Sequence, residues 1–161
     1  MLTFSVRLIV EKDGKLLFLR QTKKNGGKYS LIGGNVEDHE FAREALAREA
    51  REESGIVVSP DDMRLVHVLH RHKLKKDQVF LVLYFRADRF QGEPASLEPA
   101  KFQDVRWIDK TALPDNLSKS TRHVLEALDA GQLYSEFPSR SQSIAFWEQI
   151  QFLNRGLQSR E

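Results

Sequence analysis

Three glutamates, Glu49, Glu52 and Glu53, are close together in a stretch rich in helix-forming residues. On a helix that turns about 100° per residue, positions three or four apart share a face, so these carboxylates point in similar directions. Like charges crowded into a partly buried cleft repel one another and lose hydration, which is costly unless a cation is present. Oxygen ligands suit Mg²⁺ and Mn²⁺, and Mg²⁺ commonly bridges protein carboxylates and substrate phosphates. The three glutamates therefore predict a divalent metal site for phosphate chemistry.

The helix that positions these glutamates is expected to begin near Glu40, with Asp38 or a neighbour as its cap, and to stop at Gly55. Its apolar side chains share one sector, which should face the core: Phe41, Ala42, Leu46 and Ala50. The three glutamates fall in the same sector, so a solvated charged face does not account for them. The opposite side should face solvent and consists of Glu44, Ala47, Arg51 and Ser54.

The segment 34–56 resembles the Nudix box, G-x5-E-x7-R-E-U-x-E-E-x-G-U, in which U is aliphatic. The fixed positions are filled by Gly34, Glu40, Arg48, Glu49, Ala50, Glu52, Glu53, Gly55 and Ile56. A match at this many fixed spacings is far more specific than a lone glycine pattern. Nudix sequences often have Leu-Pro-Gly-Gly before the box. Here Ile32 stands in place of the proline, which removes some rigidity from the loop.

The resemblance implies a Mg²⁺ site, with Mn²⁺ as an alternative, whose ligands are Glu49, Glu52, Glu53 and a backbone carbonyl of Gly33 or Gly34. It also implies that Glu53 or Glu49 is the base that activates water. Glu40, Arg48 and Gly55 are implied to be structural. Arg48 should pair with Glu40 and hold the loop to the helix, which requires the loop to bend Glu40 back.

Further site residues are expected outside the box. Many Nudix proteins use an additional glutamate, and Glu98 in the segment Glu98-Pro99-Ala100-Lys101 resembles one such motif, with Glu93 as its competitor. Arg20, at a position where the family often has a basic residue, is a candidate phosphate contact. Substrate contacts are also expected from Tyr29 and from the backbone of Gly33, because glycine lets a ligand approach closely.

A cluster of histidines does not predict a zinc site. His67 lies on the opposite strand face from His70 and His72, so the three side chains do not converge.

The rest of the chain predicts an α+β fold. Strands are expected at residues 3–11, 15–21, 29–32, 56–58, 64–71, 79–85 and 104–108, with an Asp13-Gly14 hairpin between the first two. A second helix should start at 113–116 and stop at Gly131, and a last apolar helix should span 141–157. The Nudix resemblance implies an α/β/α sandwich, a mixed β-sheet with helices packed on both sides. We expect the Nudix domain at 1–138 and a helical extension, 139–161, packed on it.

Composition limits the expected cellular location and binding partners of the protein. The 161 residues have a net charge of +2, which gives no general reason to expect nucleic-acid or membrane binding. The chain has no cysteine, no apolar run near the roughly 20 residues of a membrane span, and no signal-peptide layout at its start. We therefore expect a cytoplasmic protein with a small-molecule nucleotide substrate, and the apolar last helix makes a homodimer possible.

The resemblance implies Mg²⁺-dependent hydrolysis of a nucleoside diphosphate linked to another group, X. The Glu98 motif and Trp107 favour a nucleoside triphosphate, modified or not, that gives the monophosphate and pyrophosphate. The main alternative is ADP-ribose or a nucleotide sugar, because the residues of the box contact the diphosphate and the metal but not X. The second alternative is a non-catalytic nucleotide-binding module, although such domains usually lose box glutamates and this chain keeps them all.

Overall fold

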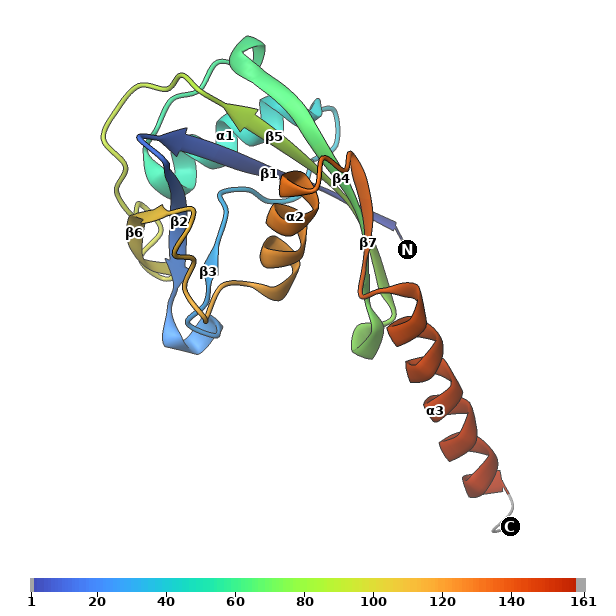
Figure 1. The fold of residues 1–161 in the computed structure, drawn as a ribbon. Helices are drawn as coiled ribbons and strands as arrows, with labels where there is room; N and C mark the ends of the chain where they lie inside the picture. The colour runs from blue at the N-terminus through green and yellow to red at the C-terminus, as the bar shows by residue number, and fades with distance from the viewer. Residues whose placement is uncertain (1, 159–161) are drawn as a thin grey trace.

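Seven strands form one mixed sheet in the computed structural model, which describes residues 2–158. The strands are β1 (Leu2–Lys12), β2 (Lys15–Gln21), β3 (Tyr29–Ser30), β4 (Met63–Lys73), β5 (Gln78–Ala87), β6 (Phe102–Asp109) and β7 (Tyr134–Phe137). The helices are α1 (Ala42–Ser54), α2 (Lys119–Asp129) and α3 (Arg140–Gln158), with short 3-10 turns at Lys23–Asn25, Pro60–Asp62 and Leu74–Lys76. Figure 1 shows how these elements are arranged.

The strand order is β3-β2-β1-β5-β4-β7, and β6 pairs with β2. β1 runs parallel to β5 and β4 runs parallel to β7, whereas the other pairs are antiparallel. The predicted β1–β2 hairpin is confirmed. Asp13 and Gly14 both have positive φ, 51° and 73°, as a tight two-residue hairpin turn requires.

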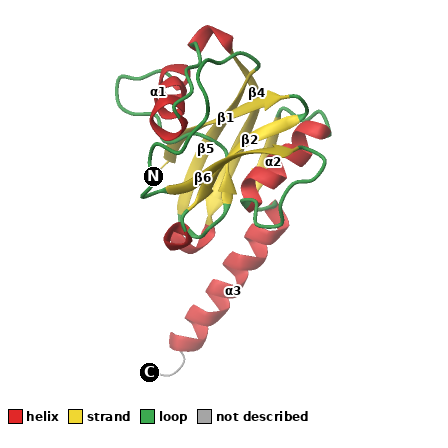
Figure 2. Ribbon diagram, turned by 90° about the vertical axis from the view of Figure 1, so that its left-hand side faces the viewer, coloured by secondary structure: helices red, strands yellow, loops and turns green. Residues whose placement is uncertain are grey.

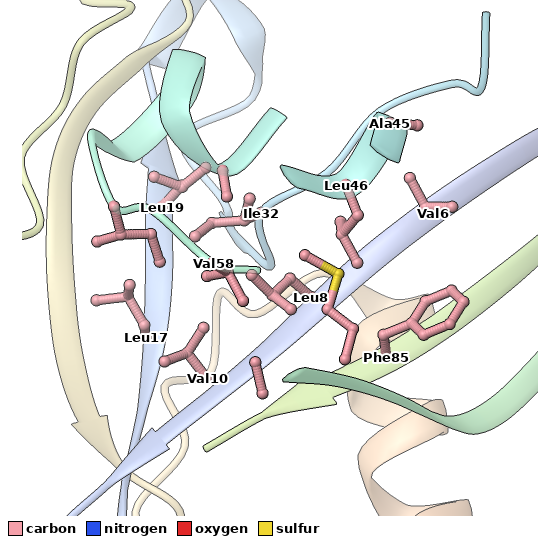
Figure 3. Packing of buried hydrophobic residues seen from close by; sticks show 14 of the residues in the cluster. Val6, Leu8, Val10, Leu17, Leu19, Ile32, Ala45, Leu46, Val58 and Phe85 are labelled. Atoms are coloured by element: carbon pink, nitrogen blue, oxygen red, sulfur yellow. The ribbon is translucent and has the colours of Figure 1, made fainter. Parts of the chain in front are cut away.

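Helices cover both faces of the sheet, so the predicted α/β/α sandwich is confirmed (Figure 2). On one face α1 contributes Ala45, Leu46 and Ala50 to a core that includes Val6, Leu8 and Val10 of β1 (Figure 3). On the other face α2 contributes Val124 and Leu125 to a core that includes Ile9, Leu69 and Val82. The alternation of side chains along β1 explains how it serves both cores.

Helix α1 begins two residues later than predicted. Its cap is Phe41, whose N–H donates to a carboxylate oxygen of Glu44 at 2.9 Å, so the expected cap at Asp38 is wrong. Phe41 is 79% exposed rather than part of the core. Ser54, expected to face solvent, is buried, and its hydroxyl donates to the carbonyl of Ala50 at 2.7 Å.

The remaining differences are local. Helix α2 begins at Lys119 rather than near residue 113, and β7 was not predicted. Between α1 and β4, Val57 makes only an isolated bridge to Gln91 instead of forming a strand.

Helix α3 confirms the predicted helix, and it projects away from the sheet in both ribbon views (Figures 1 and 2). Near its start, Phe146 lines a shallow apolar hollow with Phe137 and Pro138. Two apolar side chains of α3, Ile144 and Trp147, are exposed. Within residues 2–158, no helix is long and apolar enough to cross a membrane.

Candidate active site

The Gly33-Gly34 loop brings the chain against the last turns of α1. The N–H of Gly33 donates to Glu53 Oε2 at 2.9 Å. A side chain on either glycine would be obstructed, because an added Cβ would lie 2.1 Å from the Val6 carbonyl oxygen at Gly33 and 2.1 Å from Glu49 Oε1 at Gly34. Gly33 also has a φ of 137°, a conformation that other residues rarely adopt. The two glycines therefore allow the loop to reach both carboxylates.

Glu53 is the most buried carboxylate of the box, with 4% of its surface exposed. The pKa of its carboxyl is raised to about 7, chiefly by burial and also by the charge of Glu49. The hydrogen bond from Gly33 and the charge of Arg7 act in the opposite direction. A carboxyl with such a pKa can exchange a proton near neutral pH.

Arg48 forms the predicted ion pair with Glu40. Its Nε and Nη2 donate to the two carboxylate oxygens of Glu40 at 2.9 and 3.1 Å, and Nη1 donates to Glu49 at 3.0 Å and Glu52 at 3.2 Å. The hydrogen bond from Arg48 lowers the pKa of Glu40. The loop before α1 bends back for this pairing, and His39 in that loop has a positive φ of 67°. Arg48 thus connects Glu40 of the loop to Glu49 and Glu52 of α1.

Glu52 differs from the prediction that all three glutamates point inward. Its side chain is 51% exposed, whereas that of Glu49 is 12% exposed. The structural reason is that Arg48 draws Glu52 to the outer side of α1 through an i,i+4 ion pair.

The loop before β6 is attached to the end of α1. The N–H groups of Ala95 and Leu97 donate to the carbonyls of Ser54 and Glu53 at 3.0 and 3.1 Å, which satisfies helix carbonyls that have no partner within the helix. This attachment places Glu98 close enough to Glu53 for its charge to raise the pKa of Glu53. Glu98 itself pairs with Lys101 at 2.9 Å.

Glu93, the competitor of Glu98, lies elsewhere. It is exposed and lines a different hollow, together with Asp62 and Arg89. Of the two loop acids, therefore, the structure brings only Glu98 to the box glutamates.

A cavity of about 420 Å³ begins at Gly33. It is bounded by β1, β4 and β5, by the loop before Gly33, and by the first turn of α2, and its charged lining residues are Arg7, Lys28, Arg71 and Lys73. Sequence reasoning did not single out Arg7, Arg71 or Lys73. The signal that marks Arg7 is a lone cation within the otherwise apolar run Val6 to Val10.

Arg20 and Tyr29 do not line this cavity. The Arg20 guanidinium lies over the ring of Tyr29, with its Cζ 5.6 Å from the ring centre, and Tyr29 is buried in the core under α2. Because Gln21 lines the cavity, the preceding residue of β2 points to the other side of the strand. The substrate contacts of Arg20 and Tyr29 stay predictions.

The side chain of His67 lies apart from those of His70 and His72, as the strand alternation predicted. His67 is buried and contacts the carbonyl of Gln132 through Nδ1 at 3.0 Å and the hydroxyl of Ser135 through Nε2 at 2.8 Å. His70 and His72 contact one another through Nε2 at 3.2 Å.

Comparison with known proteins agrees with this geometry. The NUDIX domain family matches residues 1–128. The chain belongs to the Nudix family. Its Nudix domain is similar to solved structures of the same kind. The MutT NUDIX hydrolase from Burkholderia pseudomallei has a TM-score of 0.72 and 26% identity over 78% of this chain and 97% of that one. The E. coli ORF135 protein has a TM-score of 0.67 and 28% identity over 80% and 89%.

Sequence relatives of this Nudix domain act on several nucleotides. An oxidized purine nucleoside triphosphate hydrolase from Danio rerio is 30% identical over 107 residues, 66% of this chain and 65% of that protein. The nucleoside triphosphatase NudI from Salmonella agona (strain SL483) is 29% identical over 131 residues, 73% and 89% of the two chains. The NAD-capped RNA hydrolase NudC from Vibrio atlanticus (strain LGP32) is 29% identical over 109 residues, 66% and 37%. The chain thus spans less than two thirds of the Danio and Vibrio proteins.

The donor atoms of the Nudix box are of the type that hard divalent cations prefer. They are carboxylate oxygens, and both Glu49 and Glu53 keep one oxygen that forms no hydrogen bond with the side chains described between residues 2 and 151, residue 140 apart, or with the backbone of residues 2–158. Across the same residues, no three acidic, histidine or cysteine side chains already converge as a ligand shell. Arg48 lies between Glu49 and Glu52, and Glu53 faces Gly33. The free oxygens of Glu49 and Glu53 are therefore the groups that would hold such a cation.

Proposed function

We propose that this Nudix domain hydrolyses the diphosphate linkage of a nucleoside diphosphate linked to X, with a nucleoside triphosphate as substrate and the monophosphate and pyrophosphate as products. The observation that carries the proposal is the buried Glu53 carboxylate, which faces the Gly33 N–H and lies near Glu49 at the edge of a cavity. Two of the relatives are named for nucleoside triphosphates, which agrees with this substrate.

The residues that would hold Mg²⁺, or Mn²⁺, are Glu49, Glu52, Glu53 and Glu98, with a carbonyl of Gly33 or Gly34. The bound ion would screen the charge of the diphosphate and acidify a water molecule. Glu53 is the base we favour over Glu49, because it is the more buried of the two and accepts from the Gly33 N–H at the edge of the cavity. Arg48 acts at a distance from substrate by holding Glu40 and the loop in place.

Lys101 adds a cation beside the box glutamates. Its ammonium group pairs with Glu98 and is close enough to Glu53 and Glu49 for their charges to raise its pKa. A cation in that place can pair with the phosphates of the cleaved linkage. Trp107, which favoured a triphosphate in the sequence, packs against Phe90, with ring centres 5.9 Å apart.

The test is Mg²⁺-dependent hydrolysis of a panel of nucleoside triphosphates, ADP-ribose and nucleotide sugars, with the products separated by chromatography. We expect a nucleoside monophosphate and pyrophosphate. AMP with ribose 5-phosphate would instead assign the ADP-ribose alternative. Tight binding of one nucleotide without turnover of any would assign the non-catalytic module.

Two variants make the test specific to the site. Glu53→Gln should lower turnover by about 100-fold or more while the circular dichroism spectrum is unchanged. Glu44→Gln changes an exposed glutamate of the same helix and should leave the rate near normal. Equal rates for the two variants would remove Glu53 from the chemistry.

The setting of this activity is part of the proposal. A small nucleotide as substrate, a cytoplasmic location and a possible homodimer remain the predictions made from composition and from the apolar last helix.

A further inference from the structure

The cavity beside Gly33 has a lining of one charge sign. Arg7, Lys28, Arg71 and Lys73 line it, and none of its lining residues is acidic. Within residues 2–158, none of these four cations has a carboxylate oxygen within 4.0 Å. A neutral nucleobase does not require such a concentration of unpaired positive charge.

Strand pairing brings these cations together from distant parts of the sequence. The parallel β1–β5 register places Arg7 opposite Tyr84. The antiparallel β4–β5 register places Arg71 opposite Phe80, and Lys73 follows two residues later on the same face. The three side chains therefore occupy one side of the sheet, the side that faces α2.

Their proximity has an energetic cost in the absence of an anion. Arg71 and Lys73 are half-buried, and burial lowers the pKa of both side chains. Repulsion from Arg7 lowers both values further, and Arg71 acts in the same way on Lys73. An anion bound among them would offset both the repulsion and the lost hydration.

Hydrogen-bond donors line the cavity beside these cations. Tyr84, whose hydroxyl is a donor, lines the cavity and is only 3% exposed. The Nε of Arg71 is buried and has no partner among the residues that the structure describes. The buried hydroxyl residues Ser120 and Thr121 complete the lining from the first turn of α2. A phosphate offers only acceptor oxygens to such donors when it is fully ionised.

We infer that this cavity binds a phosphate group of the substrate other than the two joined by the scissile bond. The inference rests on the proposed function, because Gly33 both lines the cavity and donates to Glu53. The bound group is then attached to the half of the substrate that extends from the cleaved linkage over Arg7 towards Arg71 and Lys73. It is either the third phosphate of a nucleoside triphosphate or a phosphomonoester carried on X.

Two matched pairs of substrates separate these sources. ATP and ADP differ by the third phosphate, whereas ADP-ribose 2′-phosphate and ADP-ribose differ by a phosphomonoester away from the diphosphate. We expect the protein to prefer the member with the extra phosphate in one pair by tenfold or more in kcat/KM. The pair that shows this preference identifies the source.

Variants test whether the cavity is responsible. Arg71→Gln and Lys73→Gln should each reduce the preference to less than threefold, and either one serves if the other fails to fold by circular dichroism. Arg64→Gln is the matched control, since Arg64 lies exposed on the same strand and does not line the cavity. It should retain the full preference.

Calorimetric titration of Glu53→Gln protein with the same four ligands keeps the inference separate from catalysis. A tenfold preference in Kd that Arg71→Gln removes would support the phosphate subsite even if no probe is hydrolysed, in which case only the proposed function fails. Hydrolysis without any preference in either pair would overturn the subsite alone. The subsite is also overturned if Arg71→Gln changes discrimination among ATP, GTP, CTP and UTP but leaves the phosphate preference intact, because the cavity would then bind a base.

Discussion

Glu53 combines burial with a negative charge, and this combination has a measurable effect on stability. Its folded pKa is about 7 against an ordinary value of 4.5. Between these two values the folded protein keeps the proton and the unfolded chain has lost it. The free energy of unfolding of the metal-free protein therefore falls as pH rises through this window, and the loss is complete above about pH 7.

Glu53→Gln removes this pH dependence because glutamine does not ionise. In a chelating buffer at pH 8, we expect the variant to be more stable than the parent by about 2–3 kcal/mol, and the difference should vanish near pH 4.5. Urea unfolding at both pH values measures the effect. The same difference at both pH values would show that ionisation of Glu53 is not its cause.

Gly34 and Gly33 should respond differently to alanine. At Gly34 the new Cβ would meet the carboxylate end of Glu49, which can rotate away, so the fold should persist while turnover falls by about tenfold or more. At Gly33 the Cβ would meet the backbone of Val6 and φ is 137°, so the protein should lose stability. Melting temperatures and rates of both variants provide the measurement. Equal losses of stability would contradict this distinction.

At the scale of elements, α1 depends on the forked contacts of Arg48. Lysine keeps the charge but cannot hold Glu40 with two parallel hydrogen bonds and reach Glu49 as well. We expect Arg48→Lys to lower the free energy of unfolding by about 1 kcal/mol, a modest value because the groups are partly exposed. Arg51→Lys, at an exposed arginine of the same helix, is the control. Indistinguishable unfolding curves for the two variants would contradict this role.

The elements also show what a sequence can and cannot predict. Periodicity was sufficient for α1, for the β1–β2 hairpin and for the placement of three glutamates near a glycine turn. It failed at the start of α1, because Asp38 and Phe41 both precede plausible first turns and only the bend that brings Glu40 to Arg48 decides between them. That bend depends on the side-chain contacts of the folded state.

The cavity could not be predicted for a related reason. Arg7 and Arg71 are separated in sequence by about half of the Nudix domain, and they become neighbours only through the registers of β1 and β4 with β5. Single-sequence patterns give the alternation within a strand but not its alignment with a distant one.

For the whole molecule, α3 is the element least tied to the Nudix domain. A chain that ends at Ser139 should keep a melting temperature within about 4 °C of the full chain, because the described side chains of α3 meet Phe137 and Pro138 only at shallow hollows, through Ser143 and Phe146. Scanning calorimetry measures this, with Phe146→Ala in the full chain as control. A much larger loss would show that α3 supports the domain.

The same pair of chains tests self-association. Ile144 and Trp147 leave apolar surface exposed on α3, so sedimentation of the full and shortened chains compares the predicted dimer with a monomer. A dimer that persists without α3 would place the interface elsewhere.

The attachment of the loop before β6 to the end of α1 determines where this protein tolerates changes in length. Because Gln91 is bridged to Val57 and both Ala95 and Leu97 donate to helix carbonyls, residues added between Gln91 and Ala95 would leave Glu98 in register with Glu53. Residues added between Leu97 and Glu98 would move that carboxylate away from the box. Changes in length should therefore be confined to the short stretch between Gln91 and Ala95, and the part from Ala95 to Glu98 should keep a constant length.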